Sequence, residues 1–319
     1  MEGKIQYVSP FKRALYLKRV APLRNLSPDQ LALVAQQARE RFFARGAVIH
    51  RSGDALDRFH IVVDGRIAVR SAEHGDTTLR AEETLGLLTL LARWQGGLDA
   101  VADVDTRTLE IHADDLYEVF EDHFTILHNE IRTLASRTLE IRKNTPTGAY
   151  FAPRGQDAPP PERELDLIDR LQYLRRGPIF RNANIDVLLE LANRTQEAHF
   201  EPGVTLWEVG NPSGYLYALV SGNVRCTLPD GGWFRCGPGY PLGNLESQCG
   251  APRWYEAVTE TPVVAMRNKT DTFLDMLEDH FEMAREFLAA MATGLIRILV
   301  EERERKANEE GAREAVGGD

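Results

Sequence analysis

The sequence is poor in cysteine and contains no long apolar run. Its three cysteines, Cys226, Cys236 and Cys249, lie in the second half without a CxxC spacing, which argues against a disulfide framework or a zinc site. No stretch approaches the ~20 apolar residues that a transmembrane helix needs, and the N-terminus lacks the apolar core of a signal peptide. We therefore expect a cytoplasmic protein with reduced thiols and no membrane span.

Signatures of catalysis and of nucleic-acid binding are also missing. The eight histidines show no HExxH spacing, and there is no GxSxG motif, P-loop or cysteine–histidine signature. The formal net charge of −10 disfavours DNA as a partner, because phosphate contacts require a basic face. We predict no enzyme activity, no metal site, no cofactor and no nucleic-acid partner.

What the sequence does contain is an internal repeat. The tetrapeptide Glu-Asp-His-Phe occurs at residues 121–124 and again at 278–281, which are 157 positions apart. About a hundred residues align at this offset without a net gap. Five glycines coincide, and glycine marks backbone positions that need a positive φ or a close approach. The pairs are Gly46 with Gly203, Gly53 with Gly210, Gly65 with Gly222, Gly75 with Gly232, and Gly86 with Gly243. A period this long indicates two copies of a whole domain.

Both copies predict the same order of elements. A short amphipathic helix (27–40 and 184–196) precedes several short β-like runs punctuated by glycine, and a long helix follows (114–144 and 271–306). Ser27 followed by Pro28 is typical of a helix N-terminus. We predict domains over residues 11–143 and 165–305, a proline-rich linker over 144–164, and a charged tail over 306–319 that continues the last helix and frays.

The repeat resembles the cyclic-nucleotide-binding domain, whose family includes the catabolite activator protein and the tandem regulatory subunits of cyclic-nucleotide-dependent protein kinases. The most specific segments are FFARGAVIHRSGDALDRFHIVVDGRIAV (42–69) and HFEPGVTLWEVGNPSGYLYALVSGNVRC (199–226). The resemblance implies an α+β fold of two tandem antiparallel β-rolls, jelly-roll-like, each flanked by helices.

The family binds its ligand through a strand-to-helix loop, the phosphate-binding cassette, in which an arginine and helix N-terminal amides hold the cyclic phosphate and a glutamate takes the ribose hydroxyl. The second copy retains Gly243, Pro252 and Arg253 at the family spacing. Asn244 stands at the glutamate position, and Tyr255 replaces a small residue. The resemblance implies that any ligand site, for cAMP or cGMP, consists of Gly243, Asn244, Leu245, Arg253, Trp254 and Tyr255.

Two readings of these side chains stay open at this point. Arg253 either binds an anion or forms an ion pair with a nearby carboxylate such as Glu246 or Glu256. Trp254 and Tyr255 either stack on a base or fill the cavity.

The first copy retains only Gly86 of the cassette. Leu87 occupies the glutamate position and Gly96 the arginine position, so no charged group remains to anchor a phosphate. Arg93 is better interpreted as a surface residue than as a substitute. We predict that this copy binds no nucleotide.

Two functions therefore remain. In the first, the chain is a non-enzymatic regulatory protein that senses a cyclic nucleotide or a related anion through its second domain and signals to a protein partner. In the second, the tandem binds no ligand and acts as a protein-interaction adaptor or scaffold.

The two long helices carry matching apolar stripes with alternating steps of three and four residues, which is typical of helix–helix packing. One stripe is Phe124, Leu127, Ile131, Leu134, Thr138 and Ile141, and the other is Phe281, Ala284, Leu288, Met291, Leu295 and Ile298. We predict that they pair within one chain as an intramolecular pseudo-dimer. The alternatives are a homodimer through the same stripes and packing of each stripe on its own β-roll.

Light scattering distinguishes the two. The pseudo-dimer should give a 35.9 kDa monomer, and Leu134→Glu should free its halves to tumble separately because it places a charge in the apolar stripe. A species of about twice that mass, dissociated by Leu288→Glu, would contradict the prediction.

Overall fold

The computed structural model describes residues 9–71, 75–94, 97–144, 160–177, 180 and 183–316. The chain divides into two compact units. The first consists of Met1–Glu130 and Ala292–Asp319, and the second of Ile131–Met291. Each unit contains the strands of one copy of the repeat.

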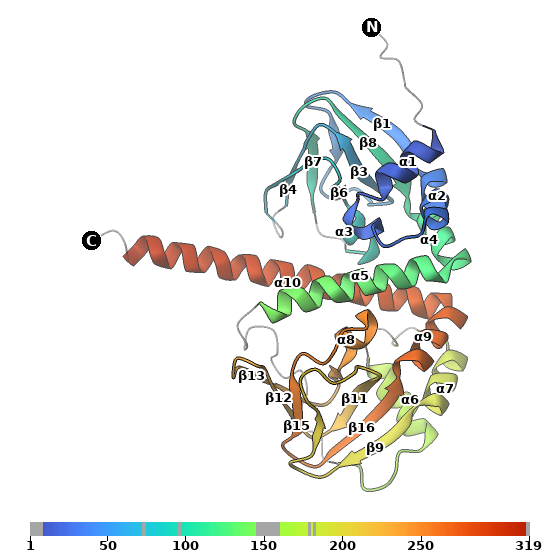
Figure 1. Ribbon diagram of the computed structural model, residues 1–319, viewed down its shortest axis with the longest axis vertical. Coiled ribbons are helices and arrows are strands. Elements are labelled where there is room, and N and C mark those ends of the chain that lie inside the picture. The colour runs from blue at the N-terminus through green and yellow to red at the C-terminus, as the bar shows by residue number, and fades with distance from the viewer. Residues whose placement is uncertain are drawn as a thin grey trace. The chain divides into compact units, whose positions relative to one another are not determined.

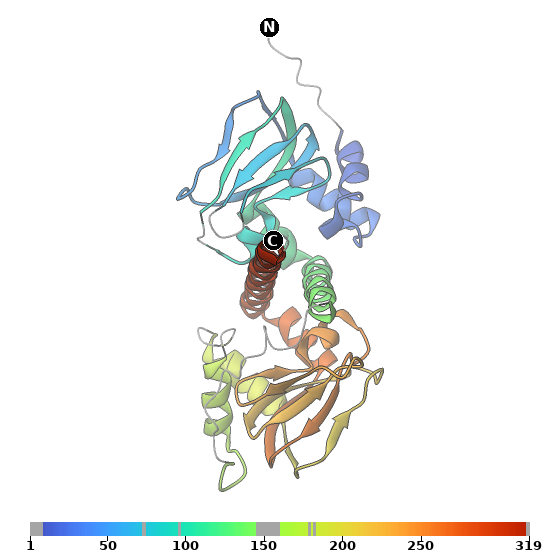
Figure 2. The same cartoon turned by 90° about the vertical axis from the view of Figure 1, so that its left-hand side faces the viewer.

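Helices α1 (Pro10–Leu17) and α2 (Pro28–Gln37) open the first copy, joined by a 3-10 turn at Ala21–Leu23. Figure 2 shows them beside the strands of the first roll. The predicted cap of α2 is confirmed: the Gln30 amide N–H donates to Ser27 Oγ at 3.3 Å, and the Ser27 N–H donates to Gln30 Oε1 at 2.9 Å. In the second copy, α6 (Leu167–Arg176) occupies the matching place before α7 (Ile185–Arg194).

The first roll consists of two four-stranded antiparallel sheets, in the orders β1-β8-β3-β6 and β2-β7-β4-β5 (Figure 1). Buried side chains of Val62, Ile67 and Ala100 form part of its core. The strands are β1 (Arg39–Phe43), β2 (Val48–His50), β3 (Arg58–Asp64), β4 (Ile67–Arg70), β5 (Thr77–Leu79), β6 (Thr84–Leu85), β7 (Asp99–Ala102) and β8 (Thr106–His112).

The second roll repeats this topology, with sheet orders β14-β11-β16-β9 and β10-β15-β12-β13. The predicted α+β fold of two antiparallel β-rolls is therefore confirmed. The strands are β9 (Gln196–Phe200), β10 (Thr205–Trp207), β11 (Tyr215–Ser221), β12 (Val224–Thr227), β13 (Trp233–Cys236), β14 (Pro241–Leu242), β15 (Glu256–Thr259) and β16 (Val263–Lys269). All three cysteines are free.

The matched glycines explain why the two copies share one backbone. Gly65 and Gly222 have φ values of 94° and 80°. A Cβ atom at Gly65 would lie 2.5 Å from Asp105 O, and one at Gly222 would overlap Pro262 O, so neither position accepts a side chain. One aligned pair differs, because Gly231 rather than Gly232 has the positive φ that corresponds to Gly75.

The long helix predicted at the end of each copy is in fact two helices. In the first copy α4 (Ala113–Asp122) and α5 (Phe124–Lys143) meet at His123, and in the second α9 (Thr270–Asp279) and α10 (Phe281–Val316) meet at His280. These histidines have φ/ψ of −135°/74° and −131°/81°, outside the helical region. The expectation of a single helix in each copy was therefore wrong, because the chain leaves the helical region at each histidine.

Helix α10 continues through most of the predicted charged tail, as far as Val316. Of the predicted linker over 144–164, residues 145–159 lie outside the described residues. In the part of the chain that the structure describes, no helix has the length and apolar character to cross a membrane. The domain boundaries and the pairing of the two apolar stripes stay predictions.

His60 is a buried histidine on β3 with a polar neighbourhood. Its Nδ1 lies 3.1 Å from Thr108 Oγ1, and it faces Glu110 across the strand pair. Burial lowers the pKa of His60 from 6.5 to about 4, against the attraction of Glu110 and with smaller contributions from Arg58 and Arg41. The folded first unit therefore holds this imidazole neutral.

This shift predicts a pH-dependent stability. The unfolded chain binds a proton at His60 near pH 6.5 and the folded chain only near pH 4, so the stabilising contribution is complete above pH 6.5 and is lost as the pH falls towards 4. The loss amounts to about 2–3 kcal/mol. His60→Tyr introduces the residue found at the matching position of the second copy, Tyr217. Between pH 7 and pH 4.5 the free energy of unfolding in urea should fall by this amount in the wild type, and this part of the fall should be absent in the variant. Parallel losses of stability in both proteins would contradict the assignment.

Candidate functional site

The cassette of the second copy begins with a backbone turn that only glycine adopts easily. Gly243 has φ 79° and precedes the short helix α8 (Asn244–Cys249). A Cβ atom at Gly243 would overlap the guanidinium of Arg253. The retained glycine is therefore needed both for its left-handed φ and for the close approach of the arginine.

Arg253 lies inside the protein, where its guanidinium is already bonded. Its Nη1 donates to Glu246 Oε1 at 3.1 Å and to Gly243 O at 3.0 Å, and its Nη2 donates to Tyr215 O. The side chains of Arg253 and Glu246 are each 2% exposed. Of the two readings, the ion pair is the one that the structure contains, and its partner is Glu246 rather than Glu256.

Trp207 completes the surroundings of this ion pair. The guanidinium carbon of Arg253 lies 4.0 Å from the centre of the Trp207 ring, a distance at which a cation is attracted by the face of the ring. Trp207 lies in β10, Tyr215 in β11 and Glu246 in α8. Arg253 therefore contacts three different elements.

Trp254 and Tyr255 fill the interior of the second roll. Their rings are perpendicular with centres 5.1 Å apart, and Tyr255 also contacts Phe234 edge-on at 5.2 Å. The Gly243 N–H donates to Tyr255 Oη at 3.1 Å. Burial raises the pKa of Tyr255 well above its ordinary value, so the phenol stays neutral. The space-filling reading of these two aromatic residues is the one that matches their positions.

The remaining predicted site residues, Asn244 and Leu245, are the first two residues of α8. Asn244 and Leu245 are half-buried, and the Asn244 amide lies 3.9 Å from Met291 Sδ. Sequence reasoning missed two neighbours from α5: Leu139 belongs to the core cluster of the second roll, and Arg142 Nη1 donates to Tyr240 Oη at 3.4 Å. No local signal marks them, because the contacts join residues about a hundred positions apart.

The cassette of the first copy is apolar. Gly86 has φ 85° and precedes α3 (Leu87–Leu91), whose side chains Leu87, Leu90 and Leu91 are buried. Arg93 is exposed and follows this helix with φ 49°. Gly96 lies outside the described residues. Helix α3 thus offers no charged side chain to a phosphate.

Among the described residues, no group of three or more histidine, cysteine, aspartate or glutamate side chains is placed to hold a metal ion.

Comparison with known proteins identifies the repeat. The sequence profile of the family described as "Cyclic nucleotide-binding domain" matches residues 40–123 and 197–280, two ranges separated by the same 157 positions as the duplicated tetrapeptide. The two matches together cover just over half of the chain.

Individual relatives share only a small part of their sequence with this chain. The chain is 28% identical over 131 residues to a CRP-like cAMP-activated global transcriptional regulator of Mycobacterium tuberculosis; the match covers 40% of this chain and 58% of that protein's length. It is also similar to two solved structures. One is the regulatory domain of Toxoplasma gondii PKA with cAMP (13% identity, 85% of this chain and 94% of that one, TM-score 0.32). The other is a regulatory subunit of a cAMP-independent protein kinase A from Trypanosoma brucei (17%, 87% and 86%, TM-score 0.33).

With matching glycine turns, matching sheets and a family profile that fits both copies at one offset, the chain belongs to the cyclic nucleotide-binding domain family and carries two such domains in tandem.

Proposed function

We propose that the chain is a non-enzymatic, cytoplasmic regulatory protein whose two domains work without a bound cyclic nucleotide, as a protein-interaction adaptor. One observation supports this above all others. The arginine that the family uses to hold a cyclic phosphate is already bonded, inside the protein, to the carboxylate of Glu246.

The energies favour this internal contact over a ligand. Withdrawing Arg253 from Glu246 leaves a buried carboxylate without its partner, which costs about 3–5 kcal/mol. A new charge-assisted hydrogen bond to a phosphate contributes only about 1.5–3 kcal/mol. A cyclic nucleotide would therefore need further favourable contacts to take the arginine from Glu246.

The aromatic filling adds to the cost of opening. Trp254 and Tyr255 are 6% and 3% exposed, and aromatic side chains of this kind bury about 150–250 Å² each. Exposing one of them costs about 4–6 kcal/mol at ~25 cal/mol per Å². The first domain contributes no alternative site, since α3 has leucine where the family has its glutamate.

A second function has one observation in its favour. Gly243, Pro252 and Arg253 keep the family spacing, so cAMP or cGMP would still meet an arginine if it displaced Glu246. Binding would then move α8 and signal to a protein partner. In this alternative the Arg253–Glu246 ion pair is the resting state of a sensor.

Calorimetric titration separates the two functions. The full chain should give no binding heat with cAMP or cGMP at concentrations up to ~1 mM. The reason is that breaking the Arg253–Glu246 ion pair costs more than a hydrogen bond from Arg253 to the phosphate would return. A micromolar affinity for either nucleotide would contradict the adaptor function. Loss of that affinity in Arg253→Met would then assign the site to the second domain.

Removing Glu246 should open the position to an anion. In Glu246→Ala the buried guanidinium lacks its counter-charge, so inorganic phosphate should raise the melting temperature by about 2–4 °C for each kcal/mol of binding. The wild type and the control Glu256→Ala, which leaves the ion pair intact, should not respond. Equal phosphate responses in all three proteins would show that Glu246 does not occupy an anion position.

A further inference from the structure

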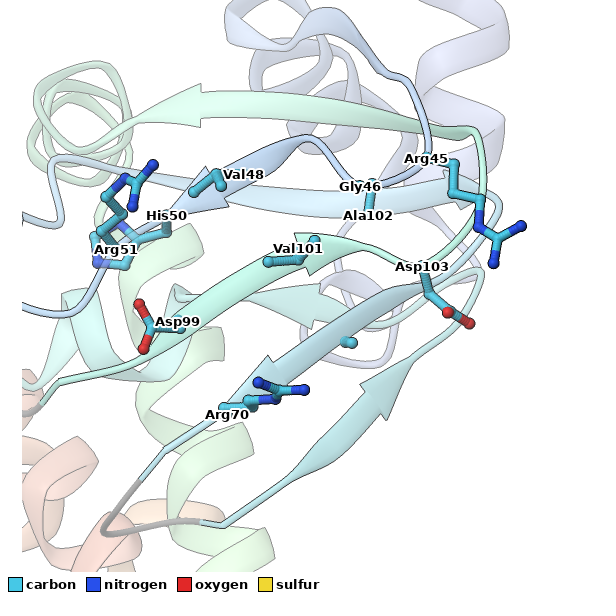
Figure 3. Close-up of a pocket in the computed structure, with 11 residues that line it drawn as sticks. Arg45, Gly46, Val48, His50, Arg51, Arg70, Asp99, Val101, Ala102 and Asp103 are labelled. Atoms are coloured by element: carbon cyan, nitrogen blue, oxygen red, sulfur yellow. The ribbon is translucent and has the colours of Figure 1, made fainter.

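A groove of about 540 Å³ lies on the first roll, over strands β2, β7 and β4 (Figure 3). On these strands most of the lining residues alternate with buried residues such as Ile67, Val69 and Ala100, so the groove is on the outer face of the sheet. Val48, Ala68 and Val101 supply apolar surface, and the Val48 side chain is 44% exposed.

Three arginines border this apolar surface. Arg45, Arg51 and Arg70 line the groove and are exposed. Within the ranges that the structure describes, none of the three takes part in an ion pair. The two acidic residues of the groove are engaged: Asp99 accepts a hydrogen bond from the Ser52 N–H at 3.0 Å, and Asp103 pairs with Arg66 at 3.0 Å. With Asp103 paired to Arg66, three arginines share the groove with the one remaining carboxylate, Asp99, so the groove has an excess of positive charge.

The arginines do not converge on one point. Figure 3 shows Arg51 beside His50 at one end of the groove and Arg45 near Asp103 at the other, with Arg70 on β4 across from β2. A single phosphate group bound at one end of the groove would not reach the arginine at the other end. Because the ends of the groove are separated by about four strand residues, or ~13 Å, the arrangement fits an extended ligand with several negative charges.

The duplication supplies an internal comparison. At an offset of 157 the three arginines correspond to Pro202, Glu208 and Thr227. The matching face of the second roll has one arginine on β12, Arg225, whose guanidinium stacks on Trp233 at 4.5 Å. The groove with an excess of positive charge thus belongs to the first copy, in a chain whose net charge is −10.

We propose that this groove binds an extended acidic segment of a partner protein. Its aliphatic side chains pack on Val48 and Val101, and its carboxylates meet Arg45, Arg51 and Arg70. The inference rests on the proposed function, because it names the surface through which the adaptor holds its partner. Charge complementarity selects the partner, and binding therefore weakens as salt is added.

Fluorescence anisotropy with the full chain tests the proposal. The probes are two labelled heptapeptides with blocked ends, one alternating glutamate with valine and the other alternating lysine with valine. The acidic peptide should bind and the basic one should not. The double variant Arg51→Glu with Arg70→Glu should weaken binding about tenfold or more, since it replaces two attractions by two repulsions. Arg225→Glu changes one charge on the matching face of the second roll and should leave the affinity unchanged.

Three outcomes would overturn the proposal: equal binding of both peptides, no detectable binding of the acidic peptide at low salt, or an affinity that the double variant does not alter. Sedimentation tests the remaining possible occupant, which is a second copy of the chain. A dimer that the double variant dissociates would assign the groove to that second copy and would also overturn the proposal. None of these results involves a nucleotide. They can therefore overturn the proposal for the groove without contradicting the adaptor function, which only nucleotide binding would contradict.

Discussion

The contact between the Arg253 guanidinium and the Glu246 carboxylate organises the second domain. Both groups are almost fully buried, and a buried charge is stable only when it is paired and hydrogen-bonded. Arg253 meets these needs by bonding to Gly243 O and Tyr215 O while it lies on Trp207. The turn at Gly243 and the aromatic core around Tyr255 are packed against this pair, so a residue type associated with ligand binding serves here as a structural centre.

Duplication shows which features of the domain are backbone requirements and which are free to change. Both copies have positive φ at the cassette glycines, Gly86 and Gly243, and both break their terminal helices at a histidine. Side-chain chemistry follows no such constraint. The first copy has an apolar helix α3 and a cationic outer groove, whereas the second has an internal ion pair and a face whose arginine stacks on a tryptophan. The two copies share a fold and differ in the side chains that they place at the cassette and on the outer face.

Much of the fold could be predicted from the sequence, because the glycine spacing, the Ser27 cap and the repeat itself are local signals. The breaks at His123 and His280 could not, since the surrounding residues are all compatible with a continuous helix. At the cassette, sequence identified Arg253 and two candidate partners but could not choose between them. The choice depends on the turn at Gly243, which brings Glu246 on α8 to the guanidinium. The contact of Leu139 with the second roll depends on tertiary packing alone.

A double-mutant cycle on the free energy of unfolding tests the central claim most directly. Arg253→Met and Glu246→Leu each remove one charge and keep an apolar side chain of similar length. If the buried ion pair closes the cassette, each single variant should lose about 3–5 kcal/mol, because the other charge stays buried without its partner. The double variant should lose far less than the sum, with a coupling of about 2 kcal/mol or more. Losses that add to within ~0.5 kcal/mol would contradict the account, because the two side chains would then act independently.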